Sequence, residues 1–377
     1  TTETYTLSLH DALPISTAGV VALNRKSPLG IGWYMHMGIM RNPFGNGGSI
    51  GSPVFEMPDG SRHTFYLDKN DVNRMISEDY WVYKRISTSA SAPFIFEMTA
   101  PDGTVYTLET GGVNAGYNEF NSAAPVAQVT KIQNASRTST ITMTYQIVKD
   151  PYLTPYSYLK TIVDTVGRVI TFNYNQSTHQ LTSISLDNRT YSYYYNTFVS
   201  TSGWRYNTLV EVKPPVGNSW RYTYETGNYG MIKLTYPTGG EINYVYAPVN
   251  FPTGGTFVYF RVISQRSTSG RDVPAGIWTY QYTPGGNSGI GTGAVTTVLA
   301  PNEMKEVYRY YSWDNCGSGF VWRVGRPMTR ELYQNNTLIE KETYTWGQGA
   351  QISFNYIKSA DWGGIVKSDS SVYLPLN

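Results

Sequence analysis

One template of 15 or 16 residues recurs along the chain and limits the fold more than any other feature of the sequence. It consists of an apolar residue, two spacers, a second apolar residue, a turn, and a run with aromatic residues two positions apart. The four best copies begin 22, 28 and 22 residues apart. They read LKTIVDTVGRVITFNY (159–174), LTSISLDNRTYSYYY (181–195), LVEVKPPVGNSWRYTY (209–224) and MIKLTYPTGGEINYVY (231–246).

Each copy predicts a β-hairpin, because Val-Gly, Asp-Asn or Gly-Gly separates two β-prone runs. Alternate residues of a strand share a face, so the aromatic pair that ends each copy forms one row. A lone hairpin cannot bury that row, whereas hairpins laid side by side can. The sequence therefore predicts an all-β fold, a curved array of antiparallel β-hairpins with aromatic ladders. The predicted ladder residues are Phe172, Tyr174, Tyr193, Tyr195, Tyr222, Tyr224, Tyr244 and Tyr246.

The region before the repeats is also rich in turn and strand signals. Pro-Asp-Gly in MPDGSRHTFYL (57–67) and APDGTVYTLE (100–109) predicts two tight turns, each opening a strand. Pro fixes φ at the first corner of such a turn, and Gly accepts a positive φ near its end. YWVYKRI (80–86) and APFIFEM (92–98) have the length and composition of strands. No long amphipathic helix is expected.

Several of these motifs together resemble the Rhs/YD-repeat proteins, a bacterial family related to teneurins and to the C components of toxin complexes. They are SPLGIGWYMHMG (27–38), the Pro-Asp-Gly turns, and the unit Gly-Arg-x-x-x-Phe-x-Tyr followed by Leu-x-x-Ile. The strongest match, GRVITFNYNQSTHQLTSI (167–184), adds Gly167 and Arg168 to the predicted repeat residues. The usual Tyr-Asp of the repeat is Tyr-Asn here, and Asn makes the same Asx turn as Asp.

The resemblance implies both a fold and a role. In that family a spiral of β-hairpins closes into a hollow β-shell that encloses a C-terminal toxin or serves as an adhesive ectodomain. Residues 16–125 would be the N-terminal β-rich region of the shell. Residues 126–377 would be its hairpin repeats, truncated at the C-terminus. The chain is therefore expected to be a non-enzymatic structural fragment, secreted or at the cell surface, whose partner is a cargo or toxin polypeptide encoded beyond it.

Composition and charge exclude several other classes of function. The formal net charge is +2, and Lys and Arg are scattered, so no nucleic-acid partner is expected. No apolar run approaches the roughly 18 residues of a membrane-spanning helix. With one cysteine, Cys316, and four histidines spread along the chain, neither a disulfide nor a metal site is predicted. No cofactor is predicted.

The first residues do not match the rest of the chain. A secretory signal needs a basic start and an apolar core, and residues 1–15 have neither. Back-translated, Thr6 to Ile15 resembles a sequencing-library adapter read in one frame. Residues 1–15 are therefore predicted to be derived from an adapter and are excluded from fold reasoning.

No catalytic residue is predicted. His63 with Asp59 and Ser61 has the residue types of a serine-hydrolase triad, but all three lie in or next to one turn and no Gly-x-Ser-x-Gly elbow is present.

Two alternatives stay open beside the structural role. One is a glycan-binding adhesin that stacks sugars on exposed aromatics, for which Trp204, Trp220 and Trp313 are the candidates. The other is a hydrolase on a β-propeller, which the 22-residue spacing disfavours because a blade needs about 40 residues.

Overall fold

The computed structural model confirms the all-β fold. It describes residues 27–33, 35–44, 52–68, 71–77, 79–87, 93–110, 126–148, 156–199, 205–227, 230–252, 257–271, 273–286, 293–317, 323–345, 347–348 and 363–364. The predicted adapter segment, residues 1–15, lies outside these ranges. The described residues divide into two compact units, unit 1 ending at Ser219 and unit 2 beginning at Trp220.

Unit 1 contains only strands, turns and short connections among its described residues. Its strands are β1 (Ile39–Arg41), β2 (Val54–Glu56), β3 (Arg62–Asp68), β4 (Asp71–Ser77), β5 (Val82–Arg85), β6 (Phe94–Thr99), β7 (Val105–Thr110), β8 (Val126–Gln133), β9 (Thr140–Val148), β10 (Tyr156–Val163), β11 (Val169–Tyr174), β12 (Leu181–Leu186), β13 (Arg189–Val199) and β14 (Arg205–Lys213).

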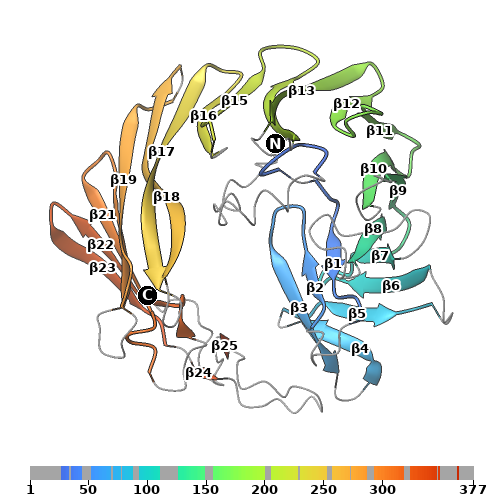
Figure 1. Cartoon of the computed structure of the whole chain (residues 1–377). Helices are drawn as coiled ribbons and strands as arrows, with labels where there is room; N and C mark the ends of the chain where they lie inside the picture. The colour runs from blue at the N-terminus through green and yellow to red at the C-terminus, as the bar shows by residue number, and fades with distance from the viewer. Residues whose placement is uncertain are drawn as a thin grey trace. The chain divides into compact units, whose positions relative to one another are not determined.

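Strands β1 to β8 close into a ring (Figure 1). Each strand pairs antiparallel with the next, and β8 pairs back onto β1 with Met40 opposite Ala127. On the same side, the second half of β8 pairs with β9, so that Lys131 lies opposite Thr142. Strand β8 therefore belongs both to the ring and to the run of hairpins that follows. The curled array predicted from the repeats did not include this closure.

Apolar side chains fill the interior of the ring. The most completely buried of them come from almost every strand: Met40, Phe55, Phe65, Tyr83, Phe96, Met98, Leu108 and Val129. Closing the ring leaves β1 and β8 without a free edge along their paired lengths, because each finds a partner on both sides. This core continues without interruption onto β9 to β12 through Tyr145, Leu159 and Leu181.

The segment Ser27–Trp33 lies against β12 to β14 and completes the core of unit 1. The amide of Leu181 donates to the carbonyl of Pro28 at 2.9 Å, and the amide of Ile31 donates to the carbonyl of Asn207 at 2.8 Å. Gly30 has φ of 87°, and a Cβ at this position would collide with that same Asn207 carbonyl. Glycine is thus needed where the segment touches the sheet.

Unit 2 contains a second run of strands. They are β15 (Trp220–Tyr224), β16 (Met231–Thr235), β17 (Gly240–Pro252), β18 (Phe257–Gly270), β19 (Gly276–Thr283), β20 (Ala294–Leu299), β21 (Met304–Tyr310), β22 (Pro327–Gln334), β23 (Thr337–Thr343), β24 (Gly347–Gln348) and β25 (Gly363–Gly364).

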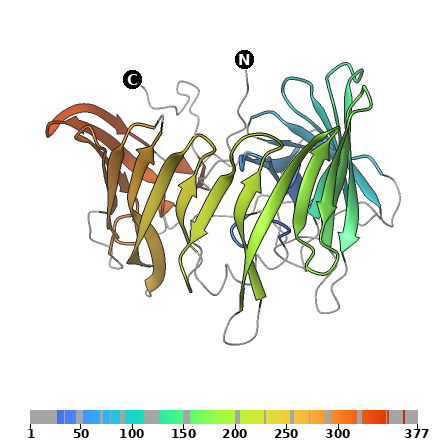
Figure 2. The same ribbon diagram turned by 90° about the horizontal axis from the view of Figure 1, so that it is seen from above.

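Strands β15 to β23 form one continuous antiparallel sheet, in which each strand pairs with the next (Figure 2). Of the described strands of unit 2, only the short β24 and β25 lie outside it. A propeller would instead break its sheet after every fourth strand. The β-propeller alternative is therefore wrong.

One turn geometry recurs in both units. The fourth residue of a five-residue turn donates its amide to the carbonyl of the first, and the first donates to the carbonyl of the fifth. This is the hairpin in which a type I turn is followed by one residue in the left-handed region. The turns are 57–61, 77–81, 100–104, 164–168, 236–240 and 300–304, with positive φ at Gly60, Tyr80, Gly103, Gly167, Gly239 and Glu303. The two Pro-Asp-Gly turns predicted from the sequence are among them.

A β-bulge recurs in every second strand from β8 to β18. The extra residue follows a buried or half-buried apolar residue, as Lys160 follows Leu159 in β10 and Thr182 follows Leu181 in β12. The same irregularity lies on β8, β14, β16 and β18. Because a bulge increases the local twist and bends the sheet, bulges at this interval explain the steady curvature of each run of hairpins.

A tyrosine of the next strand satisfies the carbonyl just before the bulge. Tyr174 donates its hydroxyl to the carbonyl of Leu159 at 2.6 Å, and Tyr195 donates to Leu181 at 2.8 Å. The same bond joins Tyr145 to Val129, Tyr246 to Met231 and Tyr282 to Ile263. In three of the repeat copies, therefore, the first and the last residue of the template are bonded to each other.

Bulged residues with a hydroxyl complete this arrangement. Thr182 donates to the carbonyl of Asn173 at 3.0 Å, and Ser264 donates to the carbonyl of Val245 at 3.2 Å. Each acceptor is the residue of the facing strand at which the register shifts. Side chains thus replace the backbone bonds that the bulge disrupts.

We expect Tyr195→Phe to lower the free energy of unfolding by about 1 kcal/mol, because it leaves the carbonyl of Leu181 without its donor. Urea unfolding followed by tryptophan fluorescence measures the change. Tyr194→Phe is the matched control, since this neighbour on β13 is 47% exposed. Equal effects of the two substitutions would contradict a stabilising role for the bond.

Candidate functional site

The predicted repeat residues occupy equivalent positions in the two units. Phe172 and Tyr222 are buried, whereas Tyr174, Tyr193, Tyr195, Tyr224, Tyr244 and Tyr246 are half-buried. Gly167 takes the positive-φ corner of the β10–β11 turn, and Arg168 donates its Nε to Asp164 Oδ2 at 2.6 Å beside it. Their common role as a structural repeat stays a prediction.

In the hairpins β11–β12 and β15–β16 the aromatic rows pair with aliphatic residues. Phe172 lies opposite Ile184, and Tyr222 lies opposite Leu234. The expected unbroken aromatic ladders are therefore mixed ladders. The reason is that each template supplies one strand with aliphatic residues and one with aromatic residues. Such aromatic–aliphatic pairs still stabilise neighbouring strands, by roughly 0.2–1 kcal/mol each.

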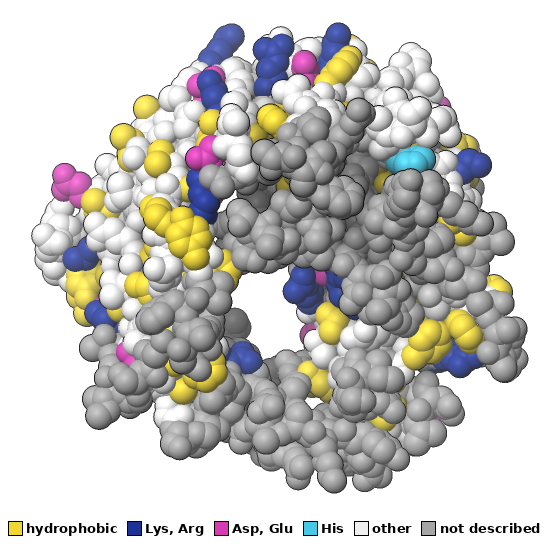
Figure 3. Space-filling model, in the orientation of Figure 1, with side chains coloured by type: hydrophobic (Ala, Val, Ile, Leu, Met, Phe, Trp, Pro, Cys, Tyr) yellow, Lys and Arg dark blue, Asp and Glu magenta, His cyan; other side chains and the backbone are white. Residues whose placement is uncertain are grey.

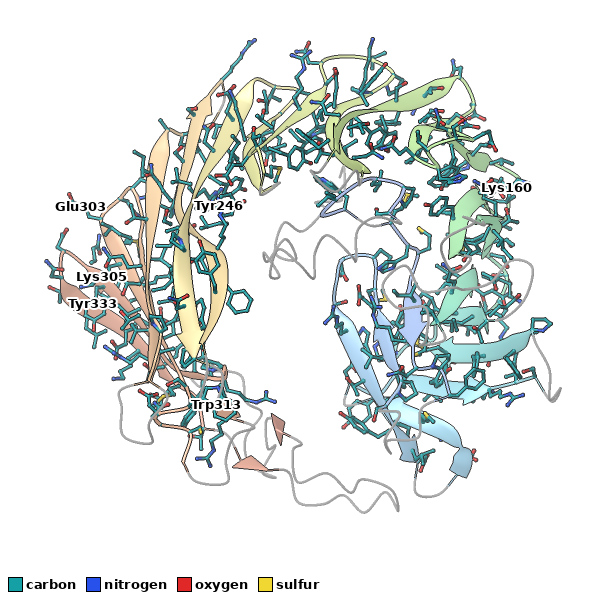
Figure 4. All side chains as sticks on the ribbon, in the orientation of Figure 1. Lys160, Tyr246, Glu303, Lys305, Trp313 and Tyr333 are labelled. Atoms are coloured by element: carbon teal, nitrogen blue, oxygen red, sulfur yellow. The ribbon has the colours of Figure 1, made fainter. Side chains whose placement is uncertain are left out.

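One face of the unit 2 sheet carries many of the aromatic residues described in that unit. Strand register and alternation place them together: Tyr222, Tyr224, Tyr244, Tyr246, Trp278, Tyr280, Tyr282, Tyr308 and Tyr310. Figure 4 shows Tyr246 on the concave side of this sheet and shows Lys305 and Tyr333 on its convex side. We call the nine residues the concave aromatic face of unit 2.

Guanidinium groups lie over this face. The guanidinium carbon of Arg261 is 5.0 Å from the ring centroid of Tyr246, and that of Arg266 is 4.7 Å from the ring centroid of Trp278. Both distances suit cation–π attraction. The face therefore combines aromatic rings with guanidinium groups, of which that of Arg261 is also paired with Glu225 at 2.5 Å. Sequence analysis missed these arginines because their positions depend on cross-strand register.

Partial burial also alters the tyrosine hydroxyls of the concave aromatic face. Burial and the neighbouring Tyr244 raise the pKa of Tyr246 to about 12. Burial beside Tyr280 raises the pKa of Tyr282 to about 12. Both rings are therefore neutral hydrogen-bonding groups at any physiological pH.

A buried carboxylate joins the first three strands of unit 1. Glu56 on β2 is 1% exposed and accepts hydrogen bonds from Arg41 Nη2 at 3.1 Å and Arg62 Nε at 3.2 Å. His36 Nε2 lies 3.6 Å from its other oxygen. Burial alone would raise the pKa of Glu56, but the nearby imidazole of His36 and the charges of the two arginines lower it to about 2.

The residues considered for a triad do not assemble as one. His63 Nδ1 lies 2.6 Å from Asp79 Oδ2 on the next turn, whereas Asp59 accepts the hydroxyl and amide of Ser61 at 2.8 and 3.0 Å. The imidazole stacks on Trp81, with centroids 4.4 Å apart. Asp79, which lies 16 residues from His63, carried no local signal that sequence analysis could use.

The three tryptophans considered for glycan stacking do not form a described exposed platform. Trp204 lies outside the described residues. Trp220 on β15 and Trp313, in the turn after β21, are both half-buried. Trp313 is labelled in Figure 4. Glycan binding by these residues stays a hypothesis.

Nowhere in the described ranges do three or more His, Cys, Asp or Glu side chains gather so that they could hold a metal ion. The described part of the chain also contains no helix long and apolar enough to cross a membrane. Figure 3 shows Lys and Arg spread over the face in view rather than gathered into one patch.

Comparison with known proteins gives solved structures only. No protein-family model matches the chain, and no curated protein matches it. The N-terminal domain of effector protein SpvB from Salmonella typhimurium strain LT2 is 11% identical, with 66% of this chain and 91% of that chain covered and a TM-score of 0.29.

Two toxin-complex structures match more of the chain less closely. The Photorhabdus luminescens Tc holotoxin pore, in a TccC3 variant, is 10% identical over 80% of this chain with a TM-score of 0.21. A TcdB2-TccC3-TEV structure is 10% identical over 79%, with a TM-score of 0.14. This chain spans 22% of the length of each. At such TM-scores the likenesses carry no argument about function.

We expect the stability of unit 1 to fall as the pH drops from about 4.5 to about 2. The lowered pKa of Glu56 means that its charged form stabilises the folded state above the ordinary carboxyl pKa of 4.5, and protonation removes that contribution. The loss is about 3 kcal/mol. Glu56→Gln should therefore unfold more easily at pH 7 and vary less between pH 5 and 3. Glu303→Gln, at an exposed turn, serves as control; a pH profile unchanged by Glu56→Gln would contradict the assignment.

Proposed function

We propose that this chain is a non-enzymatic wall segment of an Rhs/YD-repeat-type β-shell, and that its concave aromatic face contacts an enclosed polypeptide such as a toxin. The observation that carries the proposal is the contrast between the units. In unit 1 the aromatic rows of β11 and β13 pack on a core that includes Leu29. In unit 2 the corresponding face is rich in tyrosine, is half-buried except for the buried Tyr222, and lies beneath the guanidinium groups of Arg261 and Arg266.

The chemistry of the face favours a polypeptide over a small substrate. It extends over strands β15 to β21 rather than converging on one point. Tyrosine and tryptophan offer large contact areas with a polar edge, and the nearby arginines add hydrogen-bond donors. A partner polypeptide with apolar and acidic residues can contact the aromatic rings and also accept hydrogen bonds from the arginines.

We expect the double variant Trp278→Ala/Tyr282→Ala to bind an unfolded polypeptide at least about tenfold more weakly than the unaltered chain, since two large aromatic contacts are lost. Reduced, carboxymethylated α-lactalbumin, which stays unfolded and is acidic, is a suitable probe. Fluorescence anisotropy of the labelled probe measures the affinity.

Ile277→Ala is the matched control, because Ile277 precedes Trp278 on β19, points to the opposite face and is 54% exposed. It should leave the affinity within about twofold of the unaltered value. Equal losses in both variants would contradict binding at the concave face. Binding of neutral oligosaccharides but not of the polypeptide would favour the adhesin alternative.

A further inference from the structure

Two of the six recurring turns lack the glycine that the other four share. The positive-φ position holds Gly60, Gly103, Gly167 and Gly239 in four turns, but Tyr80 and Glu303 in the remaining two. A left-handed conformation is unfavourable for any residue with a Cβ and is an outlier for a bulky one. Tyr80 adopts φ of 67° at this position. The same fold accepts glycine there, so local geometry does not explain the tyrosine.

Packing does not explain Tyr80 either. Its side chain is 76% exposed, although Trp81 beside it is 9% exposed and belongs to the core. A residue held in an unfavourable conformation without burial points to a role outside folding, since strained positions cluster at binding sites.

The turn that carries Tyr80 is held firmly. Ser77 Oγ donates to Asp79 Oδ1 at 2.6 Å and accepts the amide of Trp81 at 2.9 Å. Asp79 Oδ2 contacts His63 Nδ1 at 2.6 Å, and the imidazole stacks on Trp81. The exposed ring of Tyr80 is therefore presented on a fixed backbone, next to a carboxylate that is itself 51% exposed at its side chain.

The neighbouring turns make this end of the ring acidic. Turns 57–61, 77–81 and 100–104 connect β2–β3, β4–β5 and β6–β7 at one end of the ring, about 10 Å apart, given strand spacing of about 4.8 Å. Asp59, Asp79 and Asp102 lie in these three turns.

Ion pairs engage the basic residues close to these turns. Arg62, which follows the first of them, binds Glu56. Arg137, on the adjacent β8–β9 turn, binds Glu97 at 3.0 Å.

We propose that Tyr80, with the carboxylate of Asp79, is a docking point for a basic segment of a partner polypeptide. A Lys or Arg side chain of the partner lies over the exposed tyrosine ring and pairs with the acidic end of the ring of strands. Cation–π attraction and the surrounding negative charge favour the same kind of ligand. The site lies in unit 1 and does not depend on the concave aromatic face of unit 2.

Binding of a basic peptide to the whole chain tests this. The probe is a fluorescein-labelled twelve-residue peptide of Lys, Arg, Gly and Ser, followed by anisotropy at about 0.15 M salt, where weak surface attraction is screened. Tyr80→Gly should weaken binding about fivefold and raise the melting temperature by about 2 °C, because glycine relieves the left-handed backbone. Tyr80→Phe should bind like the unaltered chain, because the ring face makes the contact.

Glu303→Gly is the matched control, since it removes the same backbone strain from the same turn geometry in unit 2. It should raise the melting temperature similarly and leave peptide affinity within about twofold. The proposal is overturned if the basic peptide does not bind, or if Tyr80→Gly binds it as tightly as Glu303→Gly. It is also overturned if an acidic peptide or a neutral oligosaccharide, rather than the basic peptide, binds in a manner that depends on Tyr80.

Discussion

The hydrogen bond from a tyrosine hydroxyl to the carbonyl before a bulge, formed at β8, β10, β12, β16 and β18, is the interaction on which the hairpin arrays depend. A bulge gives the sheet its bend but disrupts the ladder, and an unpaired carbonyl in a buried region is costly. Leu159 and Leu181 are 3% and 0% exposed, so water does not reach these sites freely. Tyr174 and Tyr195 supply the missing donors from within the sheet. These bends of the sheet therefore need a tyrosine hydroxyl beside the bulge, and the 33 tyrosines of the chain can supply these donors at regular intervals.

The two units use these bulged hairpins differently. In unit 1 the strands first close into a ring, and the segment Ser27–Trp33 then covers the inner side of β12 to β14. The aromatic rows become part of one core there. In unit 2 the nine-stranded sheet leaves its rows half-buried beneath guanidinium groups. A half-buried tyrosine keeps a surface that another polypeptide can cover.

The sequence was sufficient for the hairpins and not for their closure. The template of Leu159–Tyr174 predicted two strands and a turn because period and turn chemistry are local properties. The template begins and ends with the two partners of the tyrosine–carbonyl bond, Leu159 and Tyr174, but the sequence did not indicate that they are bonded to each other. The sequence contains no comparable signal for the pairing of Met40 with Ala127, because β1 is only three residues long and its register depends on distant strands. The neighbours of Glu56 were missed for the same reason, as were the aliphatic partners of the aromatic rows.

The shortness of β1 also explains why a charged group is buried beside it. Three residues can form few ladder hydrogen bonds, yet β1 must hold β2 on one side and β8 on the other. Arg41 on β1 and Arg62 on β3 both bind Glu56 on β2, which adds side-chain bonds across three adjacent strands. Removing one partner from such a cluster would leave an uncompensated charge, which is more costly than never having buried the group. Ionic side chains therefore reinforce the ring beside its shortest strand, and acid should loosen it first between β1 and β2.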